Sequence, residues 1–188
     1  MDKKRDFIES FGKYTILMLL ISFLAWIMET LVVSIPRGRF YDRGFLTLPF
    51  CTIYGFALLV IFFLFGTPDE GGKLFGKIRG KSLRYPLYFL CAALLVTTFE
   101  LCTGLFFEWA FGIELWTYAH RPLNFMGYIS LDYSVMWGFC ITLIMKFIFP
   151  VLKKLVFGMS RRLSDIVAAL LIGAVSTDFC ILIVKMIF

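Results

Sequence analysis

The sequence contains one histidine, His120, and its five cysteines are scattered singly through apolar stretches. Transition-metal sites in proteins use clustered Cys and His ligands, so this pattern does not favour one. An odd number of isolated cysteines in apolar runs is typical of buried free thiols, not of a disulfide framework. No Ser–His–Asp order or activated-cysteine context is present, so covalent catalysis has no support. We therefore expect no catalytic site, no cofactor and no metal.

Charged residues are also scarce, at 17% of the chain, whereas 60% of the residues are hydrophobic. Soluble domains carry roughly 45–50% apolar residues, so the composition indicates a membrane protein. Lys and Arg outnumber Asp and Glu by 19 to 13, but they lie between apolar runs. There they orient the protein and contact lipid headgroups. The lipid bilayer is therefore an expected partner, and nucleic acid is not.

Long apolar runs are abundant, and a membrane span needs about 20 such residues. Five runs reach this length, which predicts an all-α polytopic membrane helix bundle, with residues 1–188 as a single membrane domain. Pro150 is expected to stop the fourth span. The segment 112–130 is amphipathic and aromatic, which favours an interfacial or re-entrant element at the outer face. The predicted spans are 14–35, 45–65, 86–111, 131–149 and 166–188.

Lys and Arg are distributed unevenly between these runs. With the N-terminus inside, 13 of them lie on the cytoplasmic side and 4 on the outer side. The positive-inside rule then predicts a cytoplasmic N-terminus and an external C-terminus in a multi-pass protein.

Five acidic residues lie within or beside the predicted spans. A carboxylate in hydrocarbon costs roughly 2.5–3.5 kcal/mol on insertion scales, so such residues generally mark a polar site. The rise per residue places them between the middle of the membrane and its outer surface, the depth also expected for Arg43 and Arg121. We therefore expect an outward-facing acidic cavity that binds a cation, a proton or a polar molecule. The five are Glu29, Glu100, Glu108, Asp132 and Asp178.

These acids have two interpretations. Glu100 and Glu108 lie on neighbouring faces of one helix, about 12 Å apart along its axis, so both can border a binding cavity. Alternatively, each acid pairs with an arginine, a tyrosine hydroxyl or the backbone and holds helices together. We favour binding for Glu29 and Glu100 and a structural role for Glu108 and Asp132. For Asp178 both interpretations remain open.

Several blocks of the sequence resemble a known signature. It comprises Arg43-Gly44-Phe45-Leu46, Pro49, Cys51 and Ile53-Tyr54-Gly55, then Glu100, Thr103-Gly104, Glu108, Trp116, Tyr118, Asn124, Gly127, Ile129, Leu131, Ser134 and Trp137-Gly138. This pattern resembles the CmpB-like family of small bacterial membrane proteins, labelled ABC-transporter type IV or ABC transporter permease. The resemblance spans roughly residues 29–150 and implies a bacterial inner-membrane protein with a permease role. The chain departs from the pattern at Thr117, where the family has an aspartate.

We therefore expect a permease-like transport component that binds a small polar or cationic ligand. The alternatives are a non-transporting interaction or sensor subunit with structural acids, and a lipid-acting enzyme with a carboxylate base. Gly80-Lys81-Ser82 resembles the end of a P-loop, but Phe75 stands where that motif needs glycine. An ATPase or other membrane subunit and a homo-oligomer are the protein partners considered. The candidate ligand-binding residues are Glu29, Arg43, Tyr54, Glu100, Thr103, Glu108 and Asn124.

Overall fold

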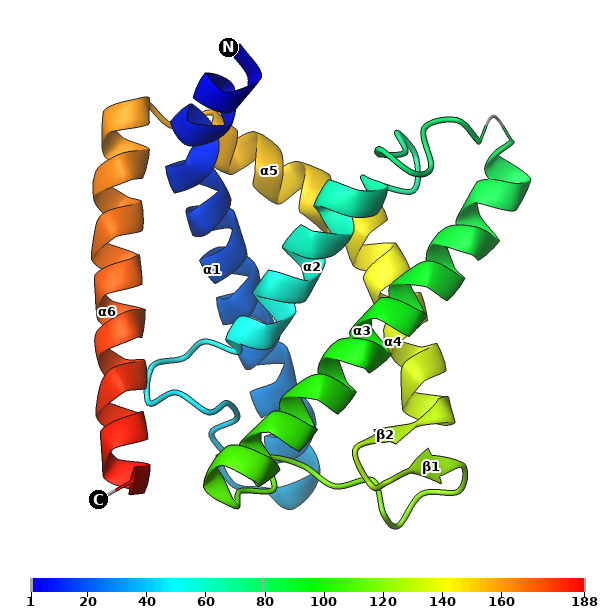
Figure 1. Ribbon diagram of the computed structural model, residues 1–188, viewed down its shortest axis with the longest axis vertical. Helices are drawn as coiled ribbons and strands as arrows, with labels where there is room; N and C mark the ends of the chain where they lie inside the picture. The colour runs from blue at the N-terminus through cyan, green and yellow to red at the C-terminus, as the bar shows by residue number, and fades with distance from the viewer. Residues whose placement is uncertain (1, 79, 188) are drawn as a thin grey trace. The chain divides into compact units, whose positions relative to one another are not determined.

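A computed structural model describes residues 2–78 and 80–187, which are mostly helical (Figure 1). The predicted all-α membrane helix bundle is confirmed. The helices are α1 (Asp2–Arg37), α2 (Thr52–Phe65), α3 (Lys81–Phe111), α4 (Leu131–Leu143), the π-helix η1 (Ile144–Ile148), α5 (Phe149–Phe157) and α6 (Arg161–Ile187). Two short strands, β1 (Asn124–Phe125) and β2 (Ile129–Ser130), precede α4.

The chain folds as two compact units. The first unit comprises Met1–Phe56 and Val151–Phe188, and the second comprises Ala57–Pro150. A single membrane domain over the whole chain therefore stays a prediction.

Among the described residues, four helical segments are long and apolar enough to cross a membrane: Ser10–Arg37, Lys81–Phe111, Leu131–Phe157 and Arg161–Met186. The last begins five residues before the predicted span, whose final residue, Phe188, lies outside the described residues. Helix α2 is shorter, with 14 residues. It rises about 21 Å, against a hydrocarbon thickness of about 30 Å.

The predicted start of the second span, at residue 45, is wrong, because residues 45–51 are irregular and precede α2. Pro49 disfavours a helical conformation at Leu48 and has no N–H to donate. The neighbouring backbone donors find partners outside any helix. The Leu48 N–H donates to Asp178, and the Cys51 N–H donates to the Ser22 carbonyl at 3.0 Å.

The expectation that Pro150 stops the fourth span is also wrong, because α4, η1 and α5 continue as one helical run to Phe157. A proline in an α-helix cannot donate to the carbonyl four residues earlier, and its ring clashes there. Here the wide π-turn Ile144–Ile148 ends two residues before the proline and relieves this conflict. As a consequence, Lys146 lies in the interior of the spanning segment and not near its end.

In the first unit, α1 and α6 pack side by side and run in the same direction (Figure 1). Gly12, early in α1, lies against Asp165, early in α6. The first turn of α2 approaches α1 through Gly55, where a Cβ atom would overlap the Met18 carbonyl oxygen and Ser22 Oγ. Glycine is therefore required at this close approach.

In the second unit, α3 packs on α4. A Cβ at Gly138 of α4 would lie 2.7 Å from Ala93 Cβ of α3, so these helices also meet through small residues. Phe62 of α2 packs on Phe149, with ring centroids 4.7 Å apart. The buried Tyr88 hydroxyl donates to the Gly66 carbonyl at 2.9 Å and fixes the loop that follows α2.

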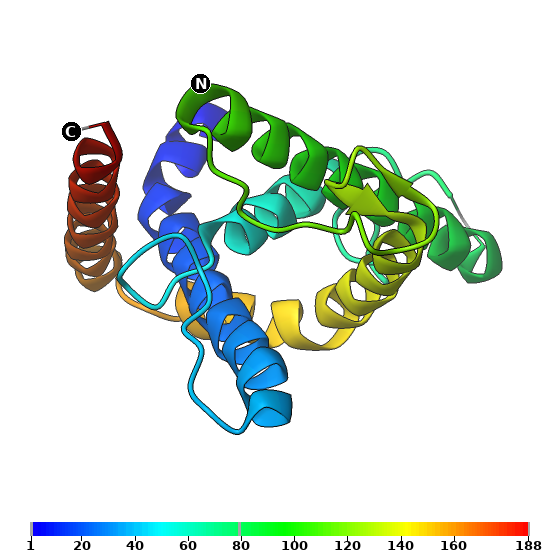
Figure 2. The same ribbon diagram turned by 90° about the horizontal axis from the view of Figure 1, so that it is seen from below.

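The segment 112–130 leaves α3 at Gly112, whose φ of 67° favours glycine, and folds back over α3. It contains a hairpin in which β1 and β2 pair antiparallel, with Asn124 opposite Ser130. Figures 1 and 2 both place this hairpin at the start of α4. The hairpin was not predicted, and the interfacial or re-entrant character of the segment stays a prediction.

Candidate ligand-binding carboxylates

The first unit brings Glu29, Arg43 and Tyr54 together from three parts of the chain. Glu29 lies on α1, and its side chain is 19% exposed. The Tyr54 hydroxyl, from the first turn of α2, donates to one carboxylate oxygen, and Arg43 Nε lies 3.6 Å from the other. A charge on the Glu29 carboxylate is therefore balanced by a cation and a hydroxyl donor.

The loop that carries Arg43 is fixed by contacts of its own residues. The Cys51 thiol donates to the Arg43 carbonyl at 3.7 Å, and Gly44 has a φ of 126°, which favours glycine. The Trp26 indole N–H donates to Asp42 at 2.6 Å and ties the loop to α1. These contacts hold the Arg43 backbone in place beside α1.

Asp178, on α6, holds the irregular segment 45–51. Its Oδ2 accepts the Leu48 N–H at 2.9 Å, and the adjacent Phe179 ring lies 5.9 Å from the Phe45 ring. Because the carboxylate satisfies a backbone donor that has no helical partner, these contacts favour a structural role for Asp178.

Glu100, on α3 in the second unit, is the most buried of the five acids, with 8% of the residue exposed. The Tyr118 hydroxyl, from the segment 112–130, donates to Glu100 Oε1 at 3.4 Å. Burial and the negative charge of Glu100 raise the pKa of Tyr118. Tyr118 also packs on Tyr133, with centroids 4.6 Å apart. The carboxylate therefore lies beneath an aromatic cover.

Glu108 lies at the exposed end of α3 and anchors the returning segment. It accepts a hydrogen bond from the Tyr128 hydroxyl, and the Tyr128 carbonyl accepts one from the Trp116 indole at 3.0 Å. The Tyr128 ring packs directly on Gly104, where a Cβ would lie 2.7 Å from Tyr128 Cδ1. These contacts favour the structural interpretation of Glu108.

The Tyr128 contact predicts a pH dependence. The hydrogen bond to Glu108, with its charge, raises the pKa of Tyr128, because the phenolate would face a carboxylate. A raised folded-state pKa adds stability that is fully present below the ordinary tyrosine pKa of about 10 and is lost as pH rises through the folded value. We expect Glu108→Gln to lower the Tyr128 midpoint, as measured by NMR with ring-labelled tyrosine. An unchanged midpoint contradicts this assignment.

Asp132 and Asn124 both stabilise the hairpin region. Asp132 accepts hydrogen bonds from Arg121, one of them from Nε at 3.0 Å, and from the Ser130 hydroxyl. The Asn124 amide donates to the Arg121 carbonyl at 2.7 Å and accepts the Gly127 N–H at 3.2 Å. The contacts of both residues therefore lie within the segment and at the start of α4.

The structure thus brings Glu29, Arg43 and Tyr54 together in the first unit, whereas Glu100, Glu108 and Asn124 of the second unit have separate partners. Tyr118 and Tyr128 were not singled out as the hydroxyl partners of Glu100 and Glu108; the aromatic composition of their segment was the available signal. Thr103 is half-buried on α3, one turn from Glu100. Within the described residues, no group of three or more His, Cys, Asp or Glu is arranged to hold a metal ion.

Comparison with known proteins gives one family. The family model described as "Putative ABC-transporter type IV" matches residues 16–183, which is most of the chain. No curated protein and no solved structure matches the chain. The family recognised from the sequence signature is therefore confirmed, and the match extends beyond residues 29–150 on both sides.

Proposed function

This chain belongs to the ABC-transporter type IV family, and on that premise we propose that it is a transport component whose membrane-embedded carboxylates bind a small cationic or polar ligand. Binding, not catalysis, is the proposed role. Glu100 is the principal ligand-binding carboxylate of the second unit. Glu29 is its counterpart in the first unit, with Arg43 as counter-ion and Tyr54 as hydrogen-bonding neighbour.

The observation that carries this proposal is the burial of Glu100 within a spanning helix. An ionised carboxylate at such a position is costly, and such residues characteristically mark substrate or ion pathways. A bound cation balances the charge in a setting of low dielectric, where electrostatic attraction is strong. Tyr118 covers the carboxylate from a segment that lies outside the spanning helices, which supports a site reached from that side.

Glu29 supports the same role in the first unit. Its contact with Arg43 Nε is 3.6 Å, longer than a charge-assisted hydrogen bond of about 2.7–2.9 Å. A ligand cation can therefore compete with Arg43 for this carboxylate. The Tyr54 hydroxyl keeps the carboxylate oriented while the cations exchange.

The proposal places the protein in a bacterial cytoplasmic membrane, with the N-terminus cytoplasmic and the C-terminus outside. The parallel packing of α1 and α6 within the first unit supports termini on opposite sides. Lys81 and Ser82 lie in the first turn of α3, not in a phosphate-binding loop after a strand. We therefore assign ATP hydrolysis to a separate partner subunit, the arrangement that the family name implies.

Carbodiimide labelling tests the proposal. Dicyclohexylcarbodiimide reacts with carboxyl groups in apolar surroundings, so membranes that contain the protein are labelled and the modified fraction of the Glu100 peptide is measured by mass spectrometry. Sodium, potassium, guanidinium and tetramethylammonium are compared at equal ionic strength. We expect at least one of these cations to lower the labelled fraction of Glu100. The labelled fraction of the exposed Glu70 is expected to stay the same. Glu100 labelling that no cation changes overturns the proposal.

A second candidate function is a non-transporting interaction or sensor subunit. The contacts of Glu108, Asp132 and Asp178 favour it, because each of these carboxylates fixes a loop or hairpin. If Glu100 has the same role, Glu100→Gln lowers the thermal stability and has no effect on ligand binding.

A further inference from the structure

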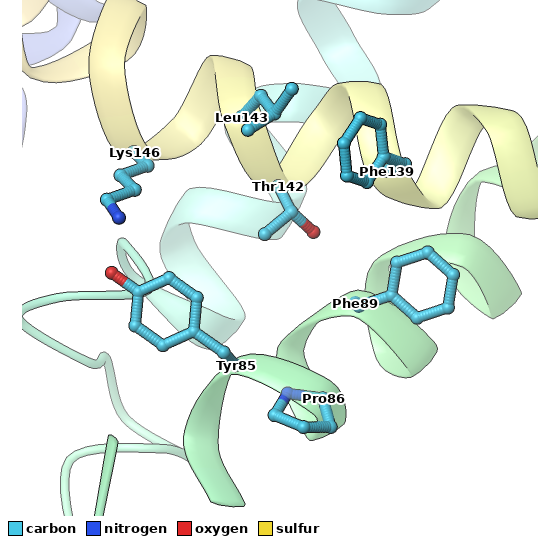
Figure 3. A pocket seen from close by; sticks show the side chains of 7 residues that line it. All are labelled: Tyr85, Pro86, Phe89, Phe139, Thr142, Leu143 and Lys146. Atoms are coloured by element: carbon cyan, nitrogen blue, oxygen red, sulfur yellow. The ribbon is translucent and has the colours of Figure 1, made fainter. Parts of the chain in front are cut away.

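A cavity of about 380 Å³ lies in the second unit, between the first turns of α3 and the α4–η1 segment (Figure 3). Its volume falls within the usual range of ligand sites, roughly 300–1,000 Å³. Its walls are mostly apolar, and none of its lining residues contributes to the carboxylate sites described above. The cavity is therefore a feature that the proposed function does not use.

The two ends of the cavity differ in polarity. Figure 3 shows Lys146 and Tyr85 at one end and Phe89 and Phe139 at the other. Tyr85 lies about 6 Å, and Phe89 about 12 Å, along the axis from Lys81, the first residue of α3. Because α3 spans the membrane, the polar end is closer to the membrane boundary and the apolar end points toward its middle. This is the orientation of a membrane phospholipid.

The Lys146 ammonium is positioned at the polar end by the π-turn and by two aromatic rings. Its Nζ lies 4.9 Å from the centroid of the Tyr85 ring and 4.9 Å from that of the Phe147 ring. π-turns within α-helices frequently occur at functional sites. Within the described residues, no carboxylate lies within the 4.0 Å of an ion pair with Lys146.

The acidic group beside this end of the cavity already has partners. Asp69 accepts a hydrogen bond from the Tyr85 hydroxyl at 2.8 Å and pairs with Lys81 at 3.4 Å. These contacts lower the pKa of Asp69, with a smaller effect from the more distant Lys146. Arg84 donates to the Asp69 and Ile78 carbonyls. The cavity mouth therefore carries more positive than negative charge.

We propose that this cavity binds one anionic phospholipid. Its phosphate accepts a hydrogen bond from the Lys146 ammonium, and an acyl chain lies along Phe89 and Phe139. Basic pockets between spanning helices recognise anionic headgroups by the same chemistry. With the predicted orientation, the lipid belongs to the cytoplasmic leaflet.

Native mass spectrometry of delipidated protein, titrated with phosphatidylglycerol or with phosphatidylcholine of the same acyl chains, tests this proposal. We expect Lys146→Gln to weaken phosphatidylglycerol binding about fivefold, the effect of one lysine near an anionic surface, and to weaken phosphatidylcholine binding less, because the choline cation already balances the phosphate charge. Lys146→Arg keeps the charge and is expected to bind both lipids like the wild type.

Two further variants separate this site from general electrostatic attraction. Lys77→Gln removes one positive charge from the loop before α3 and is expected to leave the affinity for both lipids unchanged. Thr142→Phe fills the cavity and is expected to weaken the binding of both lipids. Inorganic phosphate alone is expected to displace neither lipid. Equal phosphatidylglycerol affinity of the wild type and Lys146→Gln, an equal loss with Lys77→Gln, or unchanged binding with Thr142→Phe each overturns the proposal.

Discussion

Glu100→Gln is expected to abolish binding of the protecting cation without lowering the yield of folded protein in the membrane. Glutamine has nearly the same shape and still accepts a hydrogen bond from Tyr118, but it has no charge. Loss of one partner of a buried charge pair costs roughly 3–5 kcal/mol, so we expect affinity to fall by more than about hundredfold. The measurement is the cation-induced rise in Tm of the purified protein.

Glu108→Gln is the matched control, because it makes the same substitution eight residues later on α3. Glu108 contacts Tyr128 at the exposed helix end. We therefore expect this variant to have a lower Tm without ligand and a normal cation-induced rise. A Glu100 variant that loses stability but retains the cation-induced rise supports the interaction-subunit alternative.

Gly55→Ala is expected to cause the largest loss of stability in the first unit. The new Cβ would overlap the Met18 carbonyl oxygen and would lie 3.0 Å from the Met18 carbonyl carbon. Backbone atoms cannot rotate away as a side chain can, so α2 has to move from α1. Overpacking typically costs about 1–3 kcal/mol, and this site belongs at the upper end. Thermal unfolding of purified protein measures the loss.

Gly173→Ala is the control for this substitution, because Gly173 lies on α6 with nothing within 4 Å of a Cβ. Alanine favours a helix over glycine by roughly 0.8–1 kcal/mol, so we expect unchanged or slightly higher stability. The displacement at Gly55 also moves Tyr54 away from Glu29. Equal Tm values for the two alanine variants contradict the close approach of α1 and α2.

The long helices could be predicted from the sequence, because the hydropathy of 20 residues depends on composition and not on tertiary contacts. The start of α2 could not be predicted from the sequence, because Asp178 holds the segment 45–51. Asp178 lies 130 residues from Leu48 along the chain. The continuation through Pro150 was missed because a π-turn has no simple sequence signal.

The candidate sites were predictable to different degrees. Arg43 and Tyr54 could be grouped with Glu29 because they belong to one signature that closely follows α1. The cover of Glu100 was harder to predict, because Tyr118 reaches it only after the segment 112–130 turns back over α3. The structural roles of Glu108 and Asp132 were favoured from their positions near the interface, and their tyrosine and arginine contacts agree with that interpretation.

Native mass spectrometry of wild-type and Glu100→Gln protein, each gently extracted from its own membrane, tests the central claim most directly. We predict that the wild type retains a small-molecule or cation mass that the variant lacks, at equal yields of folded protein. The same bound masses on both proteins would contradict the assignment of Glu100 as the ligand-binding carboxylate.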